Sequence, residues 1–155
     1  MSSERFERYV VTAQRFGART VLFQEAAARH LGLTATQLEC FQLVRHEGPL
    51  TASVLAREMG LTQAALSVIV DKLVVGEFLS REQDRTDRRR WQLRAASDAI
   101  SRVDAVYTAH ARRTASLLDD YTEDELDTAL KFMNRLTEEL ARTTIELTAT
   151  LQARE

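Results

Sequence analysis

The chain has 155 residues, of which 45% are hydrophobic and 28% charged, with a formal net charge of −2. This composition excludes a disordered chain, and the acidic balance excludes a protein that coats nucleic acid with its whole surface. A single cysteine excludes an internal disulfide and a cysteine-based zinc site. No apolar run approaches the roughly 20 residues that cross a bilayer, and the N-terminal residues show no signal-peptide core. We therefore expect one cytoplasmic unit over residues 1–155 that does not contact a membrane.

The first part of the chain predicts a long amphipathic helix over residues 5–30. Its apolar side chains recur at spacings of three and four, which places them on one stripe: Phe6, Tyr9, Val10, Ala13, Phe16, Thr20, Phe23 and Ala27. The sequence GLT, residues 32–34, ends this helix. Thr34 begins a second helix with Gln37 as its capping-box partner, and the second helix ends at HEGP, residues 46–49.

A short helix, a tight turn and a further helix follow, which is the pattern of a helix-turn-helix. Thr51 begins the segment ASVLAREM, and Gly60 closes it. Thr62 then begins QAALSVIVDKLVV, residues 63–75. The inner face of this last helix is predicted to consist of Leu66, Ile69, Val70 and Leu73.

We interpret residues 63–75 as a recognition helix that reads DNA in the major groove. The candidate residues are Thr62, Gln63, Ala64, Ser67, Val68 and Lys72. Gln pairs bidentately with adenine, Ser and Thr bond base edges or phosphates, and Ala and Val contact the thymine methyl group. Because Lys72 is the only cation on this helix, we expect phosphate contacts elsewhere, with Thr51 as one candidate. The alternative is an exposed polar helix face without a DNA partner.

After Gly76 the period of the pattern changes to two. The segments FLSRE (residues 78–82) and RWQLR (residues 90–94) flank a polar turn, which predicts a β-hairpin. The candidate DNA-binding residues of this wing are Arg85, Asp87, Arg88, Arg89 and Arg90. Arginine suits the narrow, electronegative minor groove, and we expect Asp87 to tie the turn together. The alternative is a solvated loop of salt bridges, but its place after a helix-turn-helix favours DNA binding.

The last third of the chain is acidic and predicts two further helices. A capping box of Thr122 and Glu125 separates them. The final helix carries a heptad pattern at Leu126, Met133, Leu140 and Leu147. Because the helices of residues 1–33 and 97–155 exceed what the middle lobe needs for its own core, we expect them to form a homodimer. The two recognition helices would then lie about one DNA turn, roughly 34 Å, apart. The alternative is an intramolecular bundle.

No catalytic set, cofactor site or metal site is evident, so we do not expect an enzyme. The three histidines, His30, His46 and His110, are widely separated, and the chain has no Gly-rich phosphate loop. We expect Cys40 to be a buried thiol that packs as a small apolar group rather than a redox sensor.

The chain resembles the MarR family of bacterial transcriptional regulators. LTATQLECFQLVRHEGPLTASVLAREMGLTQAALSVIVDKL, residues 33–73, looks like helices two to four of the family, and DRTDRRRWQL, residues 84–93, is similar to its wing. The resemblance implies a mainly α fold, with a winged helix-turn-helix lobe and small β-hairpin wing over residues 34–94 between dimerisation helices. It also implies that Arg89 enters the minor groove, that Asp87 orients the wing, and that four residues face the major groove: Gln63, Ala64, Ser67 and Val68.

The chain departs from the family pattern at three places. Val68 stands where a basic residue is frequent, Glu77 stands where glycine is usual, and AASDA, residues 95–99, replaces a Leu-Thr-x-x-Gly motif. We expect Ser97 to take over as the cap of the helix that follows.

The resemblance further implies a small aromatic or phenolic ligand that binds between the dimerisation helices and the DNA-binding lobe and releases DNA. The candidate pocket residues are Arg15, Phe16, Arg19, Phe23 and His30. A packed interface with surface arginines is the alternative interpretation of these residues.

These observations predict a homodimeric regulator that binds double-stranded DNA sequence-specifically, at a pseudo-palindromic operator, and represses transcription until the small effector releases it. The competing hypothesis is a winged-helix protein-interaction module that has lost DNA binding. The salt dependence of binding distinguishes the two hypotheses. Binding through arginine–phosphate contacts weakens steeply as the salt concentration rises, whereas binding through an apolar interface does not.

Overall fold

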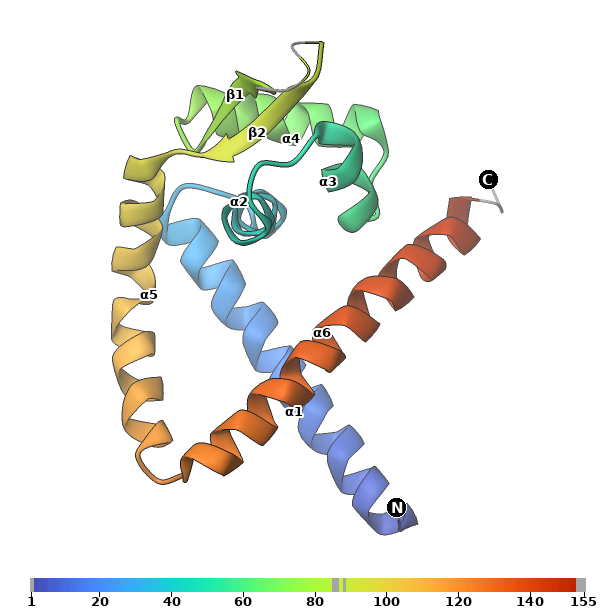
Figure 1. The fold of residues 1–155 in the computed structure, drawn as a ribbon, viewed down its shortest axis with the longest axis vertical. Coiled ribbons are helices and arrows are strands. Elements are labelled where there is room, and N and C mark those ends of the chain that lie inside the picture. Colours follow the sequence, from blue (N-terminus) through green and yellow to red (C-terminus); the bar gives the residue numbers. More distant parts are fainter. Residues whose placement is uncertain (1, 85–86, 88, 153–155) are drawn as a thin grey trace.

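The computed structural model describes residues 2–84, 87 and 89–152. Within these residues the chain is mainly helical, with one two-stranded antiparallel sheet (Figure 1). None of the described helices is long and apolar enough to span a membrane. In chain order the elements are α1 (Ser3–His30), α2 (Ala35–Glu47), α3 (Ala52–Glu58), α4 (Gln63–Val75), β1 (Leu79–Gln83), β2 (Trp91–Ala95), α5 (Ser97–Leu118) and α6 (Glu123–Gln152).

Threonine caps begin the helices of the middle lobe, as the sequence predicts. At α2 the Gln37 backbone N–H donates to the Thr34 hydroxyl at 3.2 Å, and the Gln37 side chain accepts from the Thr34 N–H at 2.9 Å. Thr51 and Thr62 cap α3 and α4 by the first of these bonds alone, since their hydroxyls accept the N–H of Val54 and Ala65. Each cap satisfies a backbone donor that has no partner within the helix, which explains why these helices begin where they do.

The hairpin pairs β1 with β2 from Leu79 opposite Ala95 to Gln83 opposite Trp91. Leu50 extends this sheet, because it exchanges two backbone hydrogen bonds with Leu93 at 3.2 and 2.7 Å. Both strands begin one residue later than predicted. For β1 the reason is Phe78, whose N–H closes the end of α4 on the Leu73 carbonyl and whose ring is buried.

The prediction that Ser97 caps α5 is wrong. Ala96 is the N-cap residue and makes no side-chain cap bond, and Ser97 is already the first residue of the helix. The Ala96 N–H donates to the Phe78 carbonyl at 3.0 Å. This bond joins the residue after β2 to the residue before β1. The start of α5 is therefore set by a contact with a distant residue and not by the local sequence.

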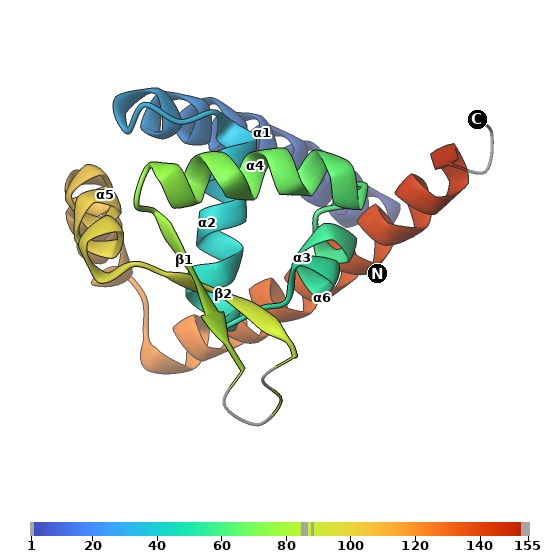
Figure 2. The same ribbon diagram turned by 90° about the horizontal axis from the view of Figure 1, so that it is seen from above.

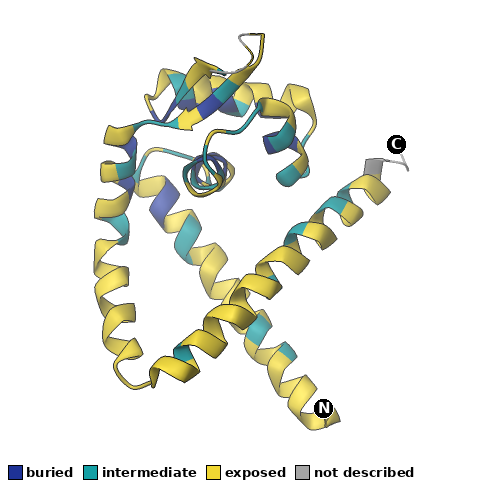
Figure 3. Ribbon diagram, in the orientation of Figure 1, coloured by how far each residue is buried: buried dark blue, intermediate teal, exposed yellow. Residues whose placement is uncertain are grey.

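The hydrophobic core lies around α2. Its largest fully buried side chains are Phe41, Leu38, Leu55, Leu66, Leu73, Val44 and Val103. Ala27 and Ala28 from the end of α1 and Ala99 from the start of α5 also belong to it. Figure 3 shows that buried residues gather in the lobe and at the ends of α1 and α5 that adjoin it, while most of the long helices is exposed.

The three long helices extend away from this lobe. α5 leads away from it, and α6 returns and crosses α1 (Figure 1), where the Tyr9 and Phe132 rings meet edge to face at 5.8 Å. The C-terminal part of α6 approaches the turn after α3. There a Cβ on Gly60, whose φ is +64°, would lie 2.5 Å from the Thr148 hydroxyl oxygen.

Candidate nucleic-acid interface

α4 presents one buried face to the lobe and one exposed face to solvent. Leu66, Val70 and Leu73 are buried, which confirms these three residues of the predicted inner face, and Ile69 is partly buried. The exposed side carries the other candidates: Gln63, Ala64, Ser67, Val68 and Lys72. The Thr62 hydroxyl is occupied as the helix cap, since it accepts the Ala65 N–H at 3.2 Å.

The hairpin lies on the same side of the molecule as α4. Seen from above, α4 and the two strands are in front of α2, and the hairpin projects beyond them (Figure 2). A protein with its recognition helix and its wing on one face can contact two adjacent grooves of a duplex.

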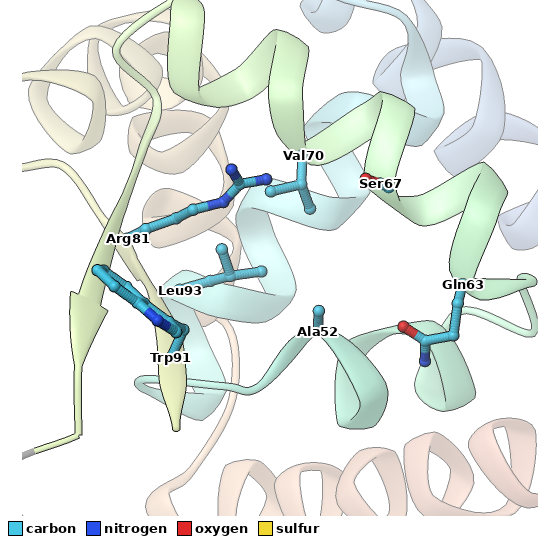
Figure 4. A pocket seen from close by; sticks show the side chains of 7 residues that line it. All are labelled: Ala52, Gln63, Ser67, Val70, Arg81, Trp91 and Leu93. Carbon is cyan, nitrogen blue, oxygen red and sulfur yellow. The ribbon is translucent and has the colours of Figure 1, made fainter. Parts of the chain in front are cut away.

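A hollow of about 250 Å³ separates the recognition helix from the wing. Gln63 and Ser67 face it from α4, Arg81 faces it from β1, and Trp91 and Leu93 face it from β2 (Figure 4). Trp91 is 55% exposed there. Arg81 and Trp91 were not among the predicted site residues, although the alternation of the two strands places them on this side of the sheet together with Leu93.

An ion pair connects the wing to the recognition helix. The Arg81 Nη2 atom lies 2.6 Å from the Asp71 Oδ1 atom, and the two side chains are 46% and 58% exposed. At this exposure the pair contributes at most about 1 kcal/mol to stability. Its electrostatic effect is more local, because it neutralises the carboxylate that α4 carries on its exposed side.

The acidic side chains of the wing are used within the hairpin. Asp84 accepts the Asp87 N–H at 3.1 Å and the Gln92 Nε2 at 2.5 Å. Asp87 accepts the Arg89 N–H at 3.0 Å, in agreement with its predicted role as a turn residue. Glu82 pairs with Arg94 across the strands at 2.9 Å. These contacts shape the hairpin and occupy its described carboxylates with backbone and side-chain donors.

The arginines at the tip differ from those in the strands. Arg89 and Arg90 are exposed, and within the described part of the chain neither forms an ion pair. The candidates Arg85 and Arg88 lie outside the described residues. The alternative of a loop of salt bridges therefore holds for Arg81 and Arg94, whereas the side chains of Arg89 and Arg90 are exposed to solvent.

Thr51 caps α3 at the edge of this face, where it is half-buried. Its hydroxyl accepts the Val54 N–H at 3.4 Å and lies 3.0 Å from the Ser53 hydroxyl. A phosphate contact of Thr51 stays a prediction.

The candidate effector residues lie in three separate places within the chain. Arg15, Phe16 and Arg19 line an open surface of α1. Phe23 lies between α1 and α5, where its ring centroid is 5.2 Å from Tyr107 and 4.9 Å from His110. His30 lines another depression, beside Phe78 and Arg102. One chain by itself therefore does not gather these residues around a common cavity.

The single cysteine lies inside the core. Cys40 is fully buried, and this burial raises the pKa of its thiol to about 12. The thiolate, which is the reactive form, is accordingly disfavoured at neutral pH. This agrees with the interpretation of Cys40 as a packing residue.

A model described as the MarR family matches residues 33–91 of this chain. The chain is 32% identical to the uncharacterized HTH-type transcriptional regulator YcgE of Bacillus subtilis over 144 residues, which cover 90% of this chain and 94% of that protein. These relatives are transcriptional regulators and not enzymes.

Solved structures share the fold. A crystal structure of MarR has a TM-score of 0.56 and 24% identity, covering 94% of this chain and 95% of that one. A Staphylococcus aureus MepR variant bound to an oligodeoxyribonucleotide has a TM-score of 0.57 and 16% identity, covering 85% and 97%. With the helix-turn-helix, the wing and the flanking helices in place, the chain belongs to the MarR family of DNA-binding transcriptional regulators.

Proposed function

We propose that the protein is a homodimeric repressor that binds a pseudo-palindromic operator sequence-specifically and leaves it when a small aromatic or phenolic effector binds. One observation carries the DNA-binding part of this proposal. The exposed face of α4 and the hairpin that carries the exposed Arg89 and Arg90 lie on one side of the molecule, and the hollow lined by Arg81 and Trp91 separates α4 from the strands. A regulator of this kind acts where the bacterial chromosome lies, so the proposal places it in the cytoplasm.

On this account each part of the face contacts a different part of the duplex. α4 enters the major groove with Gln63 and Ser67 toward the base edges. The sugar-phosphate backbone crosses the hollow in front of Arg81. Arg89 reaches into the adjacent minor groove, whose narrow A·T-rich segments attract a guanidinium group. The MepR variant of the same fold is bound to an oligodeoxyribonucleotide, which supports DNA binding by analogy of fold.

Dimerisation is supported by apolar side chains that one protomer leaves uncovered. Along α6 the heptad residues Met133, Leu140 and Leu147 are 52%, 60% and 63% exposed, and Phe16 on α1 is 66% exposed. A heptad seam is typical of helices that pack against other helices. A second copy of the chain would cover these residues and would hold two recognition helices at a spacing that matches a two-fold operator.

The effector and repression complete the proposal. In a dimer, Arg15 and Arg19 on the open surface of α1 would lie near the second copy, and their guanidinium groups suit a ligand carboxylate. A ligand bound between the helices and the lobe would favour a lobe spacing that does not match the operator, which is a population shift. Repression needs no further surface, because a dimer that occupies a promoter excludes polymerase from it.

Fluorescence anisotropy with labelled duplexes from the region upstream of the protein's own coding sequence tests the proposal. Wild type should bind one of these duplexes more tightly than a scrambled duplex, and Arg89→Ala should lose most of this preference. Arg112→Ala, an exposed arginine on α5, is the matched control and should bind as wild type does. Equal binding of native and scrambled duplexes, unchanged by Arg89→Ala, would contradict sequence-specific DNA binding.

The interaction-module hypothesis is favoured by one observation, the apolar character of α4. Val68 and Val75 are 57% and 84% exposed, and Lys72 is the one cation of the helix. A module of this kind would bind a protein partner with little dependence on salt. Raising the salt concentration in the same anisotropy titration therefore separates the hypotheses, since DNA binding through phosphate contacts must weaken.

A further inference from the structure

The exposed apolar side chains of α4 lie opposite its buried face. Helical periodicity places Ala64, Val68 and Val75 on the side away from Leu66 and Leu73. All three are exposed, and Val68 is 57% exposed although it lies in the middle of the helix. A single exposed valine is ordinary on a protein surface. Its position on the DNA-facing side of a recognition helix gives it a specific meaning.

We propose that Val68, with Ala64 beside it, reads the methyl groups of thymines, so that the half-site contains A·T base pairs under the first two turns of α4. This inference rests on the proposed function and specifies its DNA target. The thymine C5-methyl group is the apolar group that a base pair presents in the major groove. A valine that is exposed in the free protein would bury its methyl groups there on binding.

Toward the start of α4 the neighbours of Val68 are uncharged. Ala64 and Ser67 are its small neighbours on this side, and neither competes with it for room. The nearby carboxylate of Asp71 is paired with Arg81 at 2.6 Å. Around Val68 the duplex therefore meets small uncharged side chains and a paired carboxylate, and the cation of this face, Lys72, lies one turn further along α4.

The hydrogen-bonding residues of the same turns agree with this target. Gln63 is exposed and faces the hollow beside the helix (Figure 4), and Gln pairs bidentately with adenine. Guanine is read most often by Arg or Lys, but residues 62–71 contain neither. Adenine read by Gln63 and thymine read by Val68 both require A·T pairs, so two independent side chains predict the same base composition.

Deoxyuridine substitution tests the inference without any change to the protein. Wild type is used first to select the tightest binders from a library of random duplexes. Each thymine of the best duplex is then replaced, one at a time, by deoxyuridine, which lacks only the methyl group. At one thymine in each half-site the affinity should fall about fourfold, which corresponds to about 0.8 kcal/mol for one buried methyl group. Replacing that A·T pair by G·5-methylcytosine should retain more affinity than replacing it by G·C.

A pair of variants assigns the effect to Val68. Val68→Ala removes the contact from both half-sites of a homodimer, so it should bind the thymine duplex about sixteenfold more weakly, which is about fourfold for each half-site. It should no longer distinguish thymine from uracil at that position, because the effects of removing the two partners of one contact are not additive. Val75→Ala is the matched control, since it removes the same atoms from an exposed valine at the far end of α4. It should keep the wild-type preference for thymine.

Three results would overturn the inference. An enriched duplex that loses no affinity at any uracil would overturn the reading of thymine. An equal loss of affinity at uracil for wild type and Val68→Ala would overturn it as well. Both results would leave sequence-specific binding intact. Failure of the library to yield any enriched duplex would overturn the proposed function together with this inference.

Discussion

Replacing Arg81 with alanine would leave the Asp71 carboxylate without its ion-pair partner on the DNA-facing side of α4. In the intact protein the two groups are 2.6 Å apart and the pair is neutral. At about 7 Å from a DNA phosphate, an unpaired carboxylate costs about 0.6 kcal/mol at a dielectric constant of about 80 and about 2.4 kcal/mol at about 20. The Kd for an operator duplex should therefore rise between about threefold and about sixtyfold for each lobe.

The assay is an anisotropy titration of Arg81→Ala, Asp71→Asn and the double variant against one operator duplex. Asp71→Asn alone should bind at least as tightly as wild type, and the double variant should recover most of the affinity that Arg81→Ala loses. Because both side chains are about half exposed, the pair contributes less than about 1 kcal/mol to stability, so thermal melts should show all three variants folded. A double variant that binds as weakly as Arg81→Ala would refute the reasoning and would assign Arg81 a direct DNA contact.

Three further predictions concern the fold. Glu77 has a φ of +58°, so Glu77→Gly should raise the free energy of unfolding in a urea titration by roughly 0.5–1 kcal/mol. This value is the backbone strain that glycine relieves, minus the entropy that the more flexible unfolded glycine loses on folding. A loss of stability would contradict this prediction. The Cys40 thiol, with its pKa raised to about 12, should react with a thiol reagent only as fast as the protein unfolds, and rapid labelling of folded protein would count against its burial. Partial desolvation of the exposed Glu39 side chain and the charge of Glu25 raise the pKa of this carboxyl, so its ionised form opposes folding at pH values above that pKa. Glu39→Gln should therefore stabilise the protein at pH 7 by less than about 1 kcal/mol, and the gain should vanish below about pH 4; an equal gain at both pH values would exclude the charge as its cause.

Features determined by neighbouring residues were predictable from the sequence. The caps at Thr34, Thr51 and Thr62 each join a hydroxyl to a backbone N–H three residues later, and the Asp87 turn bond spans two residues. Such contacts need no tertiary structure, so residue type and spacing were sufficient to place the helices of the lobe and the tip of the wing.

Features that depend on distant residues were predicted less well. β1 begins one residue late because Phe78 packs edge to face on Phe41 at 5.9 Å and lies under the Arg102 guanidinium group. The sequence gives no local sign of that contact between α2, α5 and the hairpin. The pair of Asp71 and Arg81 joins a helix to a strand and was missed for the same reason. The candidate effector residues share a helical stripe in the sequence, but a stripe does not specify which element each residue faces.

The most direct test of the central claim is the salt dependence of operator binding. For wild type, log K should fall linearly with log salt concentration. Removing one groove-facing cation from each lobe by Arg89→Ala should reduce the magnitude of that slope by about 2 for a dimer. A slope that Arg89→Ala lowers in this way is the result that the account predicts. Binding that does not change with salt, or a slope that is the same in wild type and Arg89→Ala, would contradict a wing that meets DNA through its tip arginines.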